Sequence, residues 1–254
     1  MGVVRTDTWL ENDFHNPKKI CKQIYSNSDF YSYLVQFGMY KPNRKSWRNF
    51  LWLKEQKVWE YVEKLFKSYQ LRWDGPEVDI YIFPIESGLS FRNGARDKGG
   101  VALKGQMFLF IGEVEDEKEI EALFVHEYHH VCRMDRQNKD TKEYTLLDSM
   151  VLEGLAENAV EHYCGKDYLA KWCDFYTPDQ LQQYWEDFLK DNLNIKRDNK
   201  QHDLILFGKN RYPRLVGYSF GYYLTRNNFQ KINFSAKINF DSPSEYFINR
   251  NKIF

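Results

Sequence analysis

The sequence lacks several features that would assign a protein to a class at once. Its 36 Lys and Arg residues are balanced by 36 Asp and Glu residues, so no overall positive charge is present to attract nucleic acid. No apolar run reaches the length that spans a bilayer. The N-terminus lacks the basic and then apolar pattern of a secretion signal. We therefore expect a cytoplasmic protein with no membrane span and no nucleic-acid partner.

The cysteines argue against a disulfide framework or a thiolate zinc site. The chain has 4 of them, none in a CxxC pair, and nothing near Cys164 and Cys173 completes a set of thiolate ligands. Free thiols are the expectation. Aromatic residues, in contrast, are abundant at 17%, and we attribute them to the core and to groove lining.

The hydrophobic pattern predicts a helical N-terminal part over residues 1–72. Its main element is a long helix from about Asn43 to Gln70, with apolar residues at mixed spacings of three and four. Asp74-Gly75-Pro76 then interrupts the helical pattern. Nothing in this part suggests chemistry.

A small sheet is predicted over residues 73–112. Val78–Phe83 alternates like a strand. A stretch with four glycines over residues 88–100 is expected to be flexible, and residues 101–111 indicate one strand or two strands around Gly105.

The remaining residues, 113–254, look mainly helical. One helix should begin near Glu115, and Thr145-x-x-Asp148 is a capping box that starts the next helix. Gly217 and Gly221, four residues apart in an apolar helix, suggest close helix packing. Together the three parts predict one α+β domain over residues 1–254, with the sheet directly before the helix that carries the chemistry.

That chemistry is indicated by the segment His126-Glu127-Tyr128-His129-His130. Histidines four apart on a helix lie on one face, about one turn apart, so both imidazoles can reach one ion. Glu127 projects at an angle to them and can act on a water molecule. Apolar neighbours on both sides make solvated histidines a poor explanation, because buried polar groups need partners.

A catalytic zinc usually takes a third protein ligand and leaves a fourth position open. The next predicted helix offers three carboxylates four residues apart, on Glu153, Glu157 and Glu161. Glu161 fits a solvated stripe, whereas Glu153 has apolar neighbours and precedes Gly154, which would allow the first helix to approach closely. The spacing alone leaves Glu153 and Glu157 as alternatives.

These residues resemble the gluzincin metallopeptidases, which pair HExxH with a Glu on a later helix. More specifically, the run from Glu127 to Glu157 looks like the YjaZ-like bacterial family of predicted zinc-dependent proteases. The resemblance implies a zincin-like fold and a Zn²⁺ cofactor. It makes His126, His130 and Glu153 the metal ligands and Glu127 the general base.

The resemblance also implies roles for residues outside the motif. Glu157 takes the place of an Asp that orients the first His in thermolysin-like enzymes, although here it is a Glu. Gluzincins often stabilise the oxyanion with a Tyr or His from a later helix, and Tyr218 is our candidate, with Tyr222 and Arg214 as alternatives. The peptide would bind along the sheet edge, which we place at the strand from Leu103 to Phe110.

The other histidines receive weaker roles. His129 is interpreted as supporting the site or lying at the surface, and His15 and His202 as ordinary surface residues. The predicted function is a zinc peptidase acting on a peptide or protein. A metal-binding regulatory module without turnover and a zinc hydrolase of a non-peptide amide are the alternatives. The oligomeric state is not predicted.

Overall fold

The computed structural model describes residues 1–26, 29–86, 98–229 and 235–249. The chain divides into two compact units, Met1–Val131 and Cys132–Phe254, and each is described by itself. The single domain expected over residues 1–254 stays a prediction. Most of the glycine-rich stretch, residues 88–97, lies outside the described residues.

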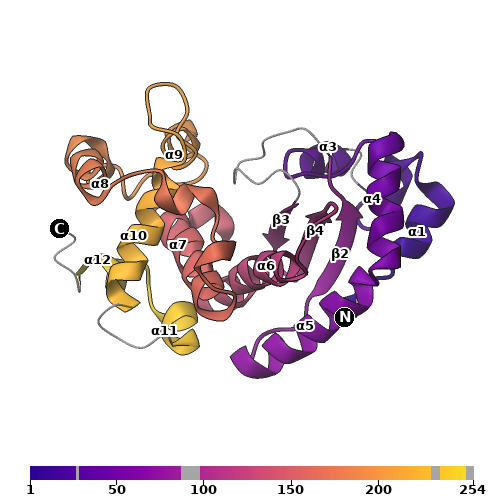
Figure 1. Cartoon of the computed structure of the whole chain (residues 1–254). Coiled ribbons are helices and arrows are strands. Elements are labelled where there is room, and N and C mark those ends of the chain that lie inside the picture. The colour runs from indigo at the N-terminus through magenta and orange to yellow at the C-terminus, as the bar shows by residue number, and fades with distance from the viewer. Residues whose placement is uncertain (27–28, 87–97, 230–234, 250–254) are drawn as a thin grey trace. The chain divides into compact units, whose positions relative to one another are not determined.

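A small mixed sheet forms the centre of the first unit (Figure 1). Among the described residues its strands are β1 (Gly2–Val3), β2 (Asp79–Pro84), β3 (Lys98–Leu103) and β4 (Gln106–Ile111), in the order β1-β2-β4-β3. β1 and β4 pair with β2 in parallel, and β3 pairs with β4 antiparallel. The pair of strands expected around Gly105 is therefore present, and Gly105 has the positive φ of 75° that its turn requires.

The sheet corrects two sequence expectations. Gly99 and Gly100 belong to β3 rather than to a flexible stretch. Most of the segment from Leu103 to Phe110 is β4, which pairs on both sides, with β2 and with β3. An edge cannot have partners on both sides, so among the described strands the edge next to β4 is β3.

The N-terminal part is helical, as expected, except for β1. Its helices are α1 (Thr6–Asp13), α2 (Pro17–Lys22), α3 (Phe30–Val35), α4 (Arg44–Glu55) and α5 (Val58–Trp73). The single helix expected from Asn43 to Gln70 is two helices, because Lys57 adopts a left-handed conformation with φ of 52°.

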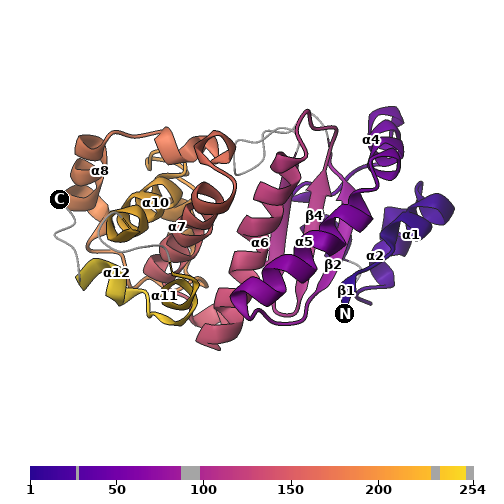
Figure 2. The same ribbon diagram turned by 60° about the horizontal axis from the view of Figure 1, so that its bottom comes forward.

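Helix α6 (Lys118–Gln137) carries the HExxH motif and begins three residues after the expected start at Glu115. It lies beside α5 on one face of the sheet (Figure 2). Phe66 and Tyr69 of α5 pack against Tyr128 and Phe124 of α6, with ring centroids 5.5 Å and 5.8 Å apart. α3 packs on the opposite face, where Phe30 lies 5.5 Å from Phe108 of β4. The motif helix thus rests directly on the sheet.

The second unit is helical in the residues that the structure describes. Its helices are α7 (Leu146–Tyr163), α8 (Pro178–Tyr184), α9 (Lys200–Leu206), α10 (Val216–Phe229), α11 (Ala236–Asp241) and α12 (Glu245–Asn249). The predicted capping box is present, because Thr145 and Asp148 each accept from the other's backbone N–H. This fixes the start of the helix that carries Glu153.

Helices α7 and α10 cross with their backbones in close contact. A Cβ on Gly154 would lie 2.1 Å from the carbonyl oxygen of Gly221, and a Cβ on Gly221 would lie 2.0 Å from that of Met150. Asn158 and Thr225 add a buried hydrogen bond of 2.8 Å across the same contact. The close packing expected at Gly221 is confirmed. Gly154 makes room for α10, and the close approach of the motif helix that the sequence suggested there stays a prediction.

We predict that Gly221→Ala destabilises the protein by about 3 kcal/mol, because the added methyl group meets main-chain atoms that cannot step aside. Urea unfolding measures this change. Asn227→Ala, at a partly exposed position of α10, is the control and should change stability by less than about 0.5 kcal/mol. Equal stability of the two variants would contradict the close crossing.

The fold class is thus a mixed α and β structure in which helices predominate and a small mixed sheet supports the motif helix. In the part of the chain that the structure describes, no helix combines the length and the hydropathy needed to cross a membrane.

Candidate metal centre

Two histidines of α6 form the first part of the site. His126 and His130 are four residues apart, and their rings lie 4.5 Å from one another between centroids. Both are buried, with 6% and 7% of their surfaces exposed. The 3.6-residue period of the helix places them on one face, as the sequence predicts. Two imidazoles are thereby held close together and away from bulk water.

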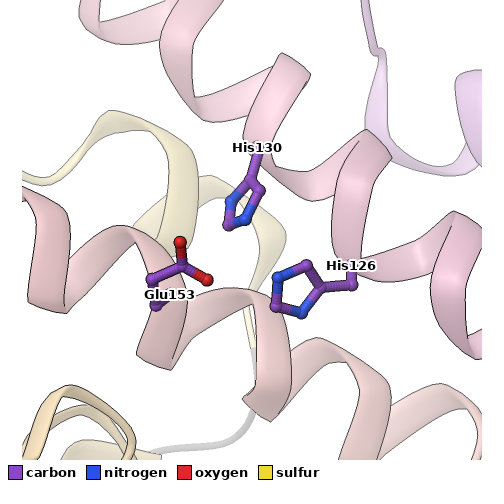
Figure 3. Close-up of side chains that lie close together, drawn as sticks. All are labelled: His126, His130 and Glu153. Carbon is purple, nitrogen blue, oxygen red and sulfur yellow. The ribbon is translucent and has the colours of Figure 1, made fainter. Parts of the chain in front are cut away.

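The third member of the site comes from α7. Ligand atoms of His126, His130 and Glu153 all lie within 4.8 Å of one another. Figure 3 shows the Glu153 carboxylate facing the two imidazoles, which extend from a different helix. Glu153 is partly buried. Glu157, the alternative ligand, is not a member of this group.

This set of side chains fits a zinc ion in its chemistry and in its spacing. Zinc accepts imidazole nitrogen and carboxylate oxygen at about 2.0–2.2 Å, so two ligands of a tetrahedral ion are about 3.4 Å apart. Atoms within 4.8 Å of one another reach that spacing through small side-chain rotations. Two His and one Glu also form the ligand set of several catalytic zinc sites, in which the fourth position stays open.

Glu127 lies beside this group on the same helix. Its side chain is 3% exposed. Its carboxyl group lies against β3, because a Cβ on Gly100 would be only 2.6 Å from Glu127 Oε1. The candidate base is therefore held between α6 and the edge strand of the sheet.

The two middle residues of the motif face α5 instead. Tyr128 stacks on Trp73 at 5.7 Å between centroids, and its hydroxyl donates to the carbonyl of Pro76 at 3.1 Å. His129 is fully buried and meets Trp73 edge to face at 5.9 Å. A surface position for His129, one of the two expectations, is therefore wrong. It is also outside the three-residue group.

Glu157 contacts the segment that follows α7. Its Oε2 accepts a hydrogen bond of 3.0 Å from the backbone N–H of Ala170, and the Cys173 thiol lies 3.7 Å from the same oxygen. Burial, and then the negative charge of Glu157, raise the pKa of Cys173, so the thiol stays protonated and can donate. Glu157 thus links α7 to this segment. Its expected role in orienting His126 remains a prediction.

Glu161 is not part of a solvated stripe. Its carboxylate accepts from the Tyr222 hydroxyl at 2.7 Å and from Arg226 at 3.4 Å, and its side chain is 19% exposed. The sequence did not reveal this because both partners lie on α10, more than 60 residues away.

The three candidates for oxyanion stabilisation differ in their surroundings. The Tyr222 hydroxyl donates to Glu161, and burial raises its pKa. Arg214 is exposed, with its guanidinium 5.6 Å from the ring centroid of Phe175. Tyr218 is buried on α10, and its ring meets Trp172 at 5.2 Å between centroids. The role of Tyr218 as the donor to the oxyanion stays a prediction.

Sequence reasoning missed a buried polar chain in the second unit. His202 is fully buried rather than at the surface, with Nε2 2.9 Å from Ser149 Oγ and Nδ1 3.0 Å from Asp203 Oδ1. His202 lies on α9 and Ser149 on α7, so the contact depends on how these helices pack. The short polar segment around His202 has no sequence pattern that predicts this burial. His15 is exposed, as expected.

The chain is similar to known proteins over most of its length. Residues 58–249 match the family described as predicted Zn-dependent protease (DUF2268), and the chain belongs to this family. It is 34% identical over 218 residues to the uncharacterized protein YjaZ of Bacillus subtilis (strain 168), a match that covers 85% of this chain and 84% of that protein. No solved structure matches the chain. The resemblance expected from the sequence is confirmed.

Proposed function

We propose that this protein is a zinc-dependent peptidase of zincin-like fold, in which His126, His130 and Glu153 hold the metal. The observation that carries the proposal is the group of three ligand atoms within 4.8 Å, with Glu127 next to it in the same motif. A purely structural zinc site normally has four protein ligands. Among the described residues this group has three, which favours a site that leaves room for water or substrate.

Each residue then has a defined task. Zinc, when bound, lowers the pKa of a water molecule and polarises a carbonyl group. Glu127 takes a proton from the attacking water and later gives it to the leaving amine. Tyr218 is proposed to donate a hydrogen bond to the oxyanion. Glu157, held by Ala170, supports the His126 side of the site.

The substrate is proposed to be a peptide that binds as an added strand along β3. This strand is the edge next to β4 in the described sheet, and its Gly100 lies against Glu127. A peptide there would form main-chain hydrogen bonds beside the base. The sequence had placed the peptide along Leu103 to Phe110, but most of that segment is β4, which already pairs on both sides.

Metal analysis combined with a cleavage assay tests the proposal. Purified protein should contain about one zinc per chain, and it should cleave members of a peptide library. A chelator should lower that cleavage at least about tenfold, and added zinc should restore it. Absence of bound metal would overturn the proposal. Metal without cleavage of peptides would favour a regulatory metal site, and cleavage of other amides alone would favour a non-peptide hydrolase.

A further inference from the structure

Two adjacent glycines of β3 face different neighbours at very short range. A Cβ on Gly100 would lie 2.6 Å from both Cγ and Oε1 of Glu127. A Cβ on Gly99 would lie 2.7 Å from the carbonyl oxygen of Phe37, in the segment after α3. Successive residues of a strand point to opposite faces, so Gly100 faces α6 and Gly99 faces the α3 side. Non-bonded atoms are not found this close to a real Cβ.

The two contacts differ in what has to move. Phe37 presents a main-chain carbonyl, which is fixed by the backbone. Glu127 presents side-chain atoms from Cγ to Oε1, which can move away only if the side chain takes another rotamer, while the backbone of α6 stays in place. The backbone of Gly100 does not itself require glycine, because Gly100 is absent from the residues with positive φ. What position 100 requires is space for the Glu127 carboxylate.

We propose that Gly100 is a positioning residue, which keeps the carboxylate of Glu127 in place by having no side chain. The inference rests on the proposed function, in which Glu127 is the base. Glu127 is 3% exposed, so a displaced carboxylate has to enter a different buried rotamer rather than open solvent. A misplacement of about 1 Å at a reacting group can lower a rate about a hundredfold.

The matched pair Gly100→Ala and Gly99→Ala tests this inference. Gly100→Ala should keep its zinc content and its KM for a cleaved peptide, lower its unfolding temperature less than Gly99→Ala does, and lose kcat by about a hundredfold. Gly99→Ala should lower the unfolding temperature, while the folded fraction keeps the kcat of the wild type. A crystal structure of Gly100→Ala should show the Glu127 carboxylate moved and His126 and His130 in place.

Several outcomes would overturn the inference. One is an unmoved Glu127 carboxylate in the crystal structure of Gly100→Ala, or an unchanged kcat. Another is a raised KM with unchanged kcat, which would mean that Gly100 contacts substrate instead of positioning the base. If Gly100→Ala fails to fold, Gly100→Ala combined with Glu127→Ala decides: restored folding supports the collision with Glu127, and continued unfolding overturns it.

These outcomes are separate from a failure of the proposed function. If the wild-type protein cleaves no amide, the catalytic proposal fails by itself. The crystal structure and the folding of the double variant would still show whether Gly100 fixes the position of the Glu127 carboxylate.

Discussion

Glu127→Gln is expected to keep its zinc and to lose kcat by about a hundred- to ten-thousandfold, the range of a general base. Gln has the shape of Glu but cannot take a proton from water. Glu127 is outside the group formed by His126, His130 and Glu153, so the metal ligands are unchanged. Zinc content by metal analysis and kcat for a cleaved peptide measure the two effects in one sample.

A control variant on the same helix distinguishes the loss of the general base from the mere loss of a negative charge. Asp135→Asn makes the same chemical change at an exposed position of α6 after the motif, and it should leave kcat unchanged. Full activity of zinc-loaded Glu127→Gln would show that another group accepts the proton. Loss of zinc from Glu127→Gln would instead make Glu127 part of the metal centre.

Local parts of this structure could be predicted from the sequence because they depend on residues close in the chain. The His126 and His130 pair follows from the helical period, and the start of α7 follows from the capping box of Thr145 and Asp148. The hairpin around Gly105 has a similar local cause. In each case the information lies within a few residues.

Most of the errors concern contacts between distant segments. The contact of Gly154 with Gly221 of α10 was not predicted, because the two residues are far apart in the sequence. β1 has two residues, too few for a strand period, and forms only because β2 is available. His202 of α9 is buried because it contacts Ser149 of α7, which is distant in the sequence. Packing decided all three, and no local pattern records it.

The candidate site combines both kinds of information. The two histidines could be predicted as a ligand pair because they lie on one helix. The spacing could not decide whether Glu153 or Glu157 is the third ligand, since both lie on the same stripe of α7. The role of Gly100 was not predicted, because the sequence does not reveal which side chain occupies the space beside a glycine in a strand. The distinction between Glu153 and Glu157 is therefore the part of the site that most needs a measurement.

Glu153→Gln is expected to weaken zinc binding by about a hundred- to a thousandfold, and Glu157→Gln by about ten- to a hundredfold. In zinc-finger peptides an apparent zinc binding energy of about 10–16 kcal/mol is shared by four ligands, and a similar share for each ligand here makes the loss of one severe. Loss of a residue that supports a ligand costs less. Competition with a chelator of known affinity measures both variants.

The two variants form a matched pair because Glu153 and Glu157 lie one turn apart on α7 and undergo the same change. Gln at position 157 can still accept the hydrogen bond from Ala170, so the segment after α7 should stay in place. An unfolding curve for each variant checks this. If Glu157→Gln loses its zinc while Glu153→Gln keeps full occupancy, Glu157 is the ligand. The carboxylate that faces His126 and His130 would then have to change its position when zinc binds.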